Sequence, residues 1–125
     1  MWNTPSKERL IWIPDLFGTD DAPLQDKLIY LHFLVSGCDW FVCEYDGSDL
    51  FWGFAILNCD YRNAEWGYFS LTELKEIRLS GWMEIDCELE EHWEVRPAFQ
   101  VEKICQAQGW NQQALPVYSV STERL

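Results

Sequence analysis

Residues 38–58, CDWFVCEYDGSDLFWGFAILN, predict two β-strands that fold back on each other about the loop Asp46-Gly47-Ser48-Asp49. Asp-Gly between two apolar and aromatic runs is a strong hairpin signal, because glycine supplies the positive φ that the turn needs. This loop predicts a register with one almost wholly apolar face. The predicted pairs are Tyr45 with Leu50, Cys43 with Trp52, Phe41 with Phe54 and Asp39 with Ile56 on that face, and Glu44 with Phe51, Val42 with Gly53 and Trp40 with Ala55 on the other.

The segments on both sides of the hairpin are expected to extend it into a sheet. Residues 27–35, KLIYLHFLV, are apolar at nearly every position, which fits either a strand buried on both faces or a buried helix that begins near Asp21. We predict a strand, because β-formers are frequent in this stretch and a Ser-Gly break then leads into the hairpin. Further strands are predicted at residues 65–69, 82–87 and 92–95.

Two short helices are predicted after the hairpin. Ser70-Leu71-Thr72-Glu73 is a capping box, in which the serine hydroxyl and the glutamate carboxylate satisfy backbone N–H groups at the start of a helix. Its expected buried stripe is Leu71, Leu74 and Ile77. The second helix is expected to have Pro97 in its first turn and Gly109 as its stop. Its expected inward-facing residues are Ala98, Val101, Ile104 and Cys105.

The chain is therefore predicted to be one α+β domain, residues 1–125, with a mostly antiparallel β-sheet built on the central hairpin and two short helices. Aromatic residues make up 16% of it and include eight tryptophans, which favours a packed domain because such rings bury well. Residues 1–23 are expected to be an irregular N-terminal arm, with at most a helical turn at 7–11 and with Trp12 and Ile13 as its anchors. Residues 110–125 are expected to be a C-terminal tail that docks through Trp110 and Val117.

The formal net charge is −12, and residues 38–94 alone hold 14 acidic and three basic residues. Such a field disfavours direct binding to nucleic acid or to an anionic membrane and favours a basic protein partner, although the charge also serves solubility. Five cysteines without metal-ligand spacing, and the lack of a signal-peptide or membrane-length apolar run, predict a cytoplasmic protein with reduced, mostly buried thiols. No metal or cofactor is expected.

Three motifs carry a resemblance to a known family: WFxxEYDG at residues 40–47, FWGF at 51–54 and EWGYxSLxEL at 65–74. In order and spacing they resemble a bacterial family described only as a domain of unknown function. Its members are small proteins often encoded on plasmids and integrative elements. The resemblance covers residues 27–77, with Trp66 where leucine is expected, and it implies no catalytic residue. It does imply a mobile-element setting, in which small acidic proteins act as accessory or counter-defence factors.

The carboxylates of Glu44 and Glu65 are the candidates for catalysis, because each lies in or beside an aromatic strand. On neighbouring strands they would face each other, and burial with like-charge repulsion would raise one pKa into the range useful for general acid–base catalysis. Tyr68 or His32 would assist in such a small enzyme. The alternative is that each carboxylate accepts backbone N–H groups or pairs with a cation from Lys27, Lys75 and Arg78.

His32 has two interpretations of its own. Across the predicted sheet it would approach Cys43 or Asp39, which would permit a Cys–His nucleophile or a metal ligand set. The competing interpretation is a half-buried histidine that is simply hydrogen-bonded.

An acidic segment, residues 84–94, is the candidate partner-binding surface. On a strand, alternate carboxylates would recur about every 7 Å, which resembles the phosphates of a nucleic-acid strand. The sequence therefore predicts a non-enzymatic inhibitor that occupies the basic groove of a nucleic-acid-binding protein. A charged edge strand that prevents aggregation, and an accessory subunit with an aromatic interface, are the alternatives. The oligomeric state stays open. The predicted contact residues are Glu84, Asp86, Glu88, Glu90, Glu91 and Glu94.

Overall fold

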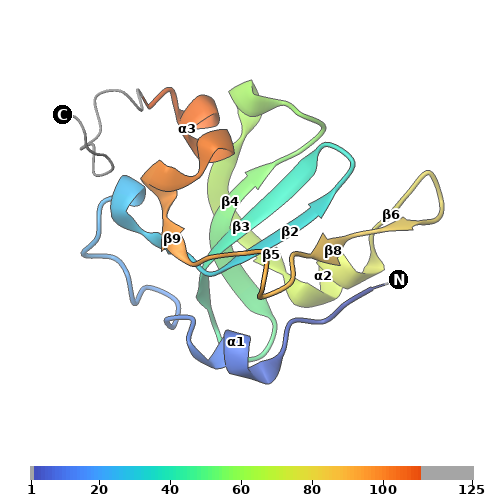
Figure 1. The fold of residues 1–125 in the computed structure, drawn as a ribbon, viewed down its shortest axis with the longest axis horizontal. Coiled ribbons are helices and arrows are strands. Elements are labelled where there is room, and N and C mark those ends of the chain that lie inside the picture. Colours follow the sequence, from blue (N-terminus) through green and yellow to red (C-terminus); the bar gives the residue numbers. More distant parts are fainter. Residues whose placement is uncertain (1, 111–125) are drawn as a thin grey trace.

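The computed structural model describes residues 2–110, and its centre is a five-stranded antiparallel sheet with the strand order β5-β4-β3-β2-β8 (Figure 1). The predicted α+β class, with a mostly antiparallel sheet around a central hairpin, is confirmed. Within the stretch 27–35, predicted as a strand, residues 31–35 are a strand of this sheet, and residues 28–29 are a short strand that pairs elsewhere. The sheet strands are β2 (Leu31–Val35), β3 (Cys38–Tyr45), β4 (Leu50–Ile56), β5 (Glu65–Ser70) and β8 (Asp86–Cys87).

Helices and small strand pairs surround this sheet. In Figure 1, α3 lies on one side of the strands and α2 on the opposite side. The helices are α1 (Lys7–Ile11), α2 (Leu71–Glu76) and α3 (Glu102–Gln108), and one-turn 3-10 helices occupy Leu24–Asp26, Tyr61–Asn63 and Ala98–Gln100. The small antiparallel pairs are β1 (Leu28–Ile29) with β9 (Arg96–Pro97), and β6 (Arg78–Leu79) with β7 (Met83–Glu84).

Each face of the sheet carries its own hydrophobic cluster. One cluster includes Phe33, Trp40 and Phe51, and α2 packs on it through Leu74. The other includes Phe41 and lies beneath α3 and the segment before it. The central strand β3 is buried along its whole length, because both of its faces are covered.

The hairpin register agrees with the prediction only up to Val42. The pairs from Asp39 with Ile56 to Val42 with Gly53 form as expected. A β-bulge then leaves Cys43 without a partner, so Glu44 pairs with Trp52, and the next pair is Tyr45 with Phe51. The three pairs predicted nearer the loop are therefore wrong. Because a bulge adds one residue to one strand, it reverses the alternation of side chains beyond it and places Glu44 on the face of Trp52.

Both predicted helices form, and the second is shorter than predicted. Ser70 and Glu73 make the complete capping box of α2. The predicted inward residues of the second helix are all buried, and Gly109 ends α3 with a φ of +70°. However, Val101 is extended, so a 3-10 turn and α3 replace one continuous helix. The 3-10 turn is held beside β1 by two interactions. Pro97 pairs with Leu28 of β1, and the Ala98 N–H donates to the Lys27 carbonyl.

Four local predictions need correction or lie outside the described residues. Residues 92–95 are not a strand, because the N–H groups of His92 and Trp93 close a turn onto the carbonyl of Leu89. Residues 82–87 form only the two short strands β7 and β8. Ile13 is buried as predicted, whereas Trp12 is 77% exposed. Trp110 packs on the cluster beneath α3, and Val117 lies outside the described residues.

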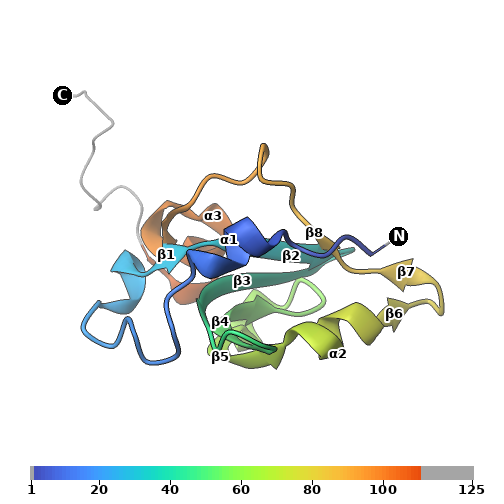
Figure 2. The ribbon, with the colours of Figure 1, turned by 90° about the horizontal axis from the view of Figure 1, so that it is seen from below.

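Figure 2 shows the sheet from its edge, with β5 and α2 along the lower rim of the molecule. Within residues 2–110, no helix has the length and apolar character that crossing a membrane requires.

Candidate functional site

The buried carboxylate of Glu44 binds the N-terminal arm to the sheet. The side chain accepts hydrogen bonds from the backbone N–H of Phe17 at 2.9 Å, from the N–H of Thr19 at 3.2 Å and from the Thr19 hydroxyl. Only 4% of the residue is exposed. A carboxylate in such a place must be well hydrogen-bonded, since an unsatisfied buried charge is very costly. Glu44 therefore positions residues 17–19 and has little accepting capacity left for a substrate.

Lys27 completes this network with the opposite charge. Its Nζ donates to the Thr19 carbonyl at 2.5 Å and to the Thr19 hydroxyl oxygen at 2.9 Å. The same ammonium lies 5.4 Å from the ring centre of Trp52, within the range of a cation–π contact. Glu44 and Lys27 thus share Thr19, and each lowers the cost of burying the other.

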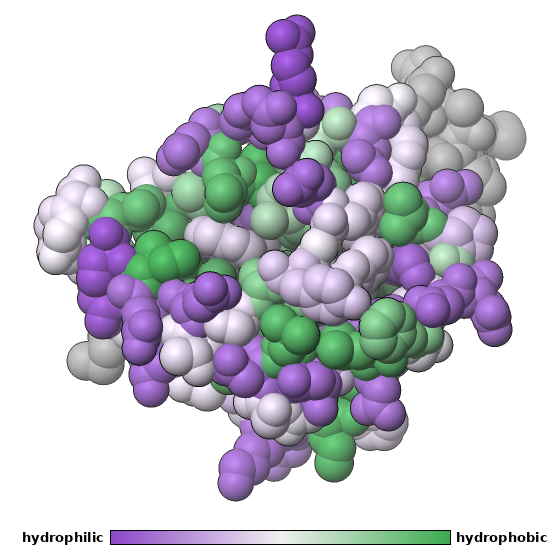
Figure 3. All heavy atoms as spheres, turned by 180° about the vertical axis from the view of Figure 1, so that it is seen from behind, coloured by the Kyte–Doolittle hydropathy of each residue, from purple (hydrophilic) through white to green (hydrophobic). Residues whose placement is uncertain are grey.

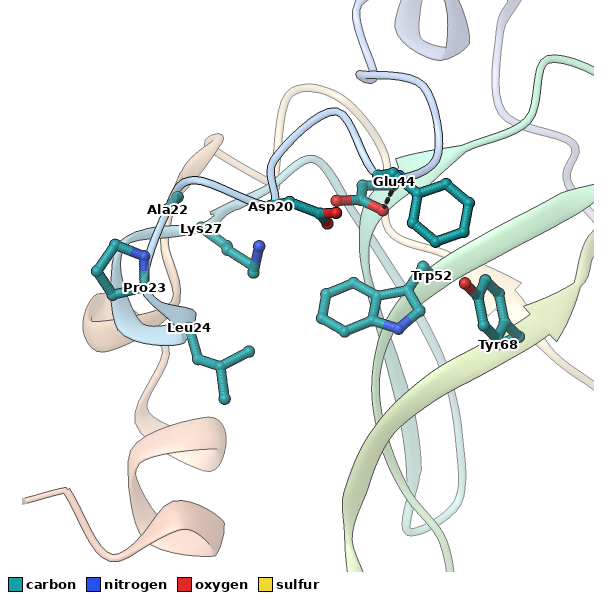
Figure 4. A pocket seen from close by; sticks show the side chains of 9 residues that line it. Asp20, Ala22, Pro23, Leu24, Lys27, Glu44, Trp52 and Tyr68 are labelled. Carbon is teal, nitrogen blue, oxygen red and sulfur yellow. Dashed lines mark hydrogen bonds between the residues drawn. The ribbon is translucent and has the colours of Figure 1, made fainter.

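A cleft of about 420 Å³ opens beside this network (Figure 4). Trp52 forms its floor, Tyr68 stands at one side and Lys27 at the other, and the carboxylates of Asp20 and Glu44 lie at the top of the view. Tyr68 pairs with Trp52 across β4 and β5 and is 53% exposed. The volume is within the range of small-ligand pockets, but the lining is a mixture of aromatic rings and charges of both signs.

Of the four residues proposed for catalysis, only Glu44 and Tyr68 line this cleft. On β4, Glu44 pairs with Trp52 and Glu65 pairs with Ala55. Trp52 and Ala55 are three residues apart, which corresponds to about 10 Å along the strand. The predicted pair of facing carboxylates therefore does not form. His32 also lies elsewhere, so the structure does not assemble these four residues into one acid–base centre.

His32 is held between two carboxylates on the far part of the sheet. Its Nε2 is 2.7 Å from Asp39 and its Nδ1 is 2.6 Å from Glu88, while its ring stacks on Phe41. Lys103 of α3 binds both oxygens of Asp39 at 3.1 Å. The predicted approach of His32 to Asp39 and the interpretation as a hydrogen-bonded histidine are both confirmed. Since both ring nitrogens are engaged, neither is available to a substrate.

Asp39 is the charged centre of this network. Burial acts to raise the pKa of its carboxyl, but the hydrogen bonds and positive charge of His32 and Lys103 outweigh burial and lower that pKa overall. The ionised form of Asp39 is therefore part of the folded structure.

The geometry does not support a Cys–His nucleophile at Cys43. The thiol is fully buried. Burial raises the pKa of the Cys43 thiol to about 12, with the charge of Lys27 acting against this shift and the charge of Glu44 adding to it. The thiolate needed for attack is therefore scarce near neutral pH. Among residues 2–110 no group of three or more His, Cys, Asp or Glu side chains has an arrangement suited to a metal ion.

The carboxylates of residues 84–94 do not form the predicted regular row. Glu84 pairs with Arg78 at 2.9 Å, and Glu88 points back to His32. Asp86 is exposed on the two-residue strand β8. Because β8 is so short, the chain leaves the extended conformation that the phosphate-like spacing requires. The remaining exposed carboxylates of this segment are Glu90, Glu91 and Glu94.

Beside these carboxylates lies an apolar hollow that the sequence did not predict. Its volume is about 300 Å³, and it is lined by Trp12, Val95 and Glu90, with Trp93, Tyr30 and Arg9 completing it. The guanidinium of Arg9 donates to the carbonyl of Glu88 at 2.8 Å and so holds α1 against the acidic segment. Trp12 was expected to anchor the arm, but its side chain lines this hollow and is mostly exposed.

Exposed apolar groups also occur elsewhere on the protein. Figure 3 shows apolar areas on the rear face, each bordered by hydrophilic side chains. Trp82, at the turn between β6 and β7, is 72% exposed.

Comparison of the chain with protein-family models, with curated proteins and with solved structures found no match of any of the three kinds. The resemblance of its three motifs to a mobile-element family therefore stays a prediction.

The role of Glu44 gives a testable prediction. Glu44→Gln replaces one accepting oxygen by an amide donor that faces the N–H groups of residues 17–19, and we expect a loss of about 2 kcal/mol of folding stability. Urea denaturation and limited proteolysis of the arm measure this effect. Asp20→Asn, at an exposed residue of the same cleft, is the matched control, with an expected change within about 0.5 kcal/mol. Equal stability of the two variants would contradict the anchoring role of Glu44.

Proposed function

We propose that this chain is a non-enzymatic protein-binding protein that docks a basic partner through an acidic surface with a tryptophan anchor. We call this the Trp12 surface. It consists of Trp12, Glu90 and Val95, which line one hollow, and of the other exposed carboxylates of residues 84–94, which are Asp86, Glu91 and Glu94. One observation carries the proposal: Trp12 is 77% exposed and shares an apolar hollow with Glu90 and Val95. An exposed apolar area with a polar rim is typical of a protein-binding site.

The two kinds of side chain have different roles in this proposal. Tryptophan is enriched among the few residues that dominate interface energies, because its large area is desolvated on binding. Carboxylates at the rim increase the rate of encounter with a positively charged surface and disfavour acidic partners. The net charge of −12 acts in the same direction at long range.

The partner class that we favour is the basic groove of a nucleic-acid-binding protein, such as a nuclease that a mobile element would need to inhibit. Charge and exposure support this choice, whereas phosphate-like spacing does not, because the carboxylates lie on a turn and a short strand. The proposal of a small enzyme with paired carboxylates loses its basis, since Glu44 and Glu65 lie apart.

The test compares two variants of equal charge. Asp86→Asn, Glu90→Gln, Glu91→Gln and Glu94→Gln are combined in the surface variant. The control variant combines Asp15→Asn, Asp21→Asn, Asp26→Asn and Glu102→Gln, all exposed positions outside the Trp12 surface. Basic proteins captured from a bacterial lysate at low salt are identified and purified, and their affinities are then measured by calorimetry at low and high salt.

We expect the surface variant to weaken binding about tenfold or more at low salt, and the control variant to weaken it much less. Trp12→Ala is expected to weaken binding about thirtyfold at either salt concentration, because the anchor is apolar. Equal affinity of the surface and control variants, together with no effect of Trp12→Ala, would overturn the proposal. Concentration-dependent self-association that is lost in Trp12→Ala would instead indicate an accessory subunit with an aromatic interface.

A further inference from the structure

Within residues 2–110, strand β5 has an open edge. It is the terminal strand of the five-stranded sheet and pairs with β4 along its whole length. The Leu71 N–H donates to the Asp49 carbonyl, which extends this ladder by one pair. Because hydrogen-bonded and non-hydrogen-bonded pairs alternate in an antiparallel ladder, Glu65, Gly67 and Phe69 also bond to β4. The N–H and C=O groups of Trp66 and Tyr68 therefore point outward, away from β4.

These outward groups have no hydrogen-bond partner within residues 2–110. The next outward N–H, that of Ser70, is taken by the Glu73 carboxylate of the capping box. The free part of the open edge is thus short and consists of the outward-facing backbone groups of Trp66 and Tyr68. Proteins usually guard such an edge with lysine, proline or a bulge, and β5 carries only the charge of Glu65.

The open edge runs between two hollows, one on each face of the sheet. Tyr68 lines the cleft of Figure 4 on one face. Phe69 lines a groove of about 490 Å³ on the other face, together with Leu57 and Ile77 and with the carboxylates of Glu73 and Glu76. Each hollow therefore combines aromatic or apolar walls with acidic groups. In the first hollow Asp20 is the exposed carboxylate, and the Lys27 ammonium also lines it. Successive side chains of a strand point to opposite faces, so a strand added to β5 would place its side chains alternately over these two hollows.

We propose that β5 accepts an extended segment of a partner protein as an additional strand of the sheet, and that this segment carries arginine or lysine at two adjacent positions, one side chain for each face. Long basic side chains suit both hollows, because their aliphatic stems cover apolar walls while their charged ends reach carboxylates. Arginine also stacks on rings such as Trp52 and Tyr68. Main-chain bonds to Trp66 and Tyr68 supply affinity that does not depend on sequence, and the hollows supply selectivity.

A second copy of this chain is a poor occupant of the same edge. Each copy has a net charge of −12, and Glu65 and Glu76 flank the edge, so edge-to-edge pairing of two copies would bring like charges together. The inference rests on the proposed function only in taking the partner to be basic, and it uses a surface separate from Trp12.

The test uses two substitutions of Tyr68. Tyr68→Ala removes the exposed side chain and keeps the outward N–H, whereas Tyr68→Pro removes both. Because that N–H does not bond to β4, proline is compatible with the existing sheet, as it is on edge strands generally. The probe is a blocked peptide of about six residues, the ordinary length of a strand, with two adjacent arginines in the middle and threonine at the other positions. Its affinity for the full-length protein is measured by calorimetry, and circular dichroism checks the fold of each variant.

We expect Tyr68→Pro to weaken peptide binding about tenfold relative to Tyr68→Ala, because one main-chain hydrogen bond is lost. A peptide with N-methyl groups at alternate amides should bind the wild type about tenfold more weakly than the parent peptide. The comparison of the two peptides uses only the wild-type protein, so it tests the main-chain hydrogen bonds even if the proline variant fails to fold.

Three results would overturn the inference. The first is equal affinity of the parent and N-methylated peptides. The second is loss of peptide binding in the Trp12 surface variant but not in Tyr68→Pro, which would assign the peptide to the surface of the proposed function. The third is a dimer of the wild type that Tyr68→Pro dissociates, which would make a second copy the occupant. Failure of the proposed function gives a different result, because a captured partner would then bind the surface and control variants equally.

Discussion

Gly53→Ala is expected to destabilise the protein by about 3 kcal/mol or more, because β3 leaves no room for a side chain at this position of β4. A Cβ atom added to Gly53 would lie 1.8 Å from the carbonyl oxygen of Phe41 and 2.9 Å from its carbonyl carbon. Both are backbone atoms, so the strands themselves must separate. Urea denaturation monitored by tryptophan fluorescence measures the loss.

Gly67→Ala is the matched control for this substitution. Gly67 pairs directly with Gly53 across β4 and β5, and a Cβ atom there would have no atom within 4 Å. Its stability should change by less than about 1 kcal/mol, with a gain expected from the less flexible unfolded chain. Equal stability of the two alanine variants would contradict the explanation that glycine is required at residue 53 because β3 and β4 approach closely there.

Asp39→Asn is expected to have the next largest effect, a loss of about 3 kcal/mol at neutral pH. The carboxylate is 2% exposed and is the shared partner of His32 and Lys103. An amide of the same shape has only one accepting oxygen and no charge, so His32 and Lys103 lose the buried carboxylate that they share. Urea denaturation at a series of pH values measures both the size of this loss and its pH dependence.

The pH dependence has a definite sign. The folded structure lowers the pKa of Asp39 below its ordinary value of 3.8, so the unfolded chain takes up a proton first as the pH falls. The stability that the ionised carboxylate contributes is complete above this ordinary value and is lost as the pH falls below it, toward the folded pKa. Wild type should therefore lose its advantage over Asp39→Asn in acid.

The exposed Asp26 supplies the control for this experiment, since Asp26→Asn should change stability by less than about 0.5 kcal/mol at any of these pH values. A constant difference between wild type and Asp39→Asn down to strongly acidic pH would show that the charge of Asp39 is not the stabilising factor.

The Asp39 network also bears on the proposed function. Glu88 lies between Asp86 and Glu90 of the Trp12 surface, and it is tied to the sheet through His32 and to α1 through Arg9. A binding surface is most effective when its side chains are held in place before the partner arrives. The buried histidine therefore helps to hold in place the segment that carries the proposed surface.

The sequence by itself determined the features that depend on neighbours along the chain. The loop from Asp46 to Asp49 and the capping box of Ser70 and Glu73 form as predicted, because their hydrogen bonds connect residues within a few positions of each other. Gly109 ends its helix for a similar local reason, since it adopts a left-handed conformation that other residues disfavour. The alternating and helical apolar patterns were sufficient for the fold class and for most of the core.

Only the tertiary structure decided where the polar and aromatic candidates lie. The bulge at Cys43 moves Glu44 to the face of Trp52, and its partner Thr19 comes from an arm with no regular pattern. His32 meets Glu88 across a separation of 56 residues. The side chain of Trp12 is exposed, although it was predicted to anchor the arm on the core. Each of these outcomes depends on contacts between segments far apart in the chain, and such contacts leave no periodic signal in the sequence, so packing alone determined them.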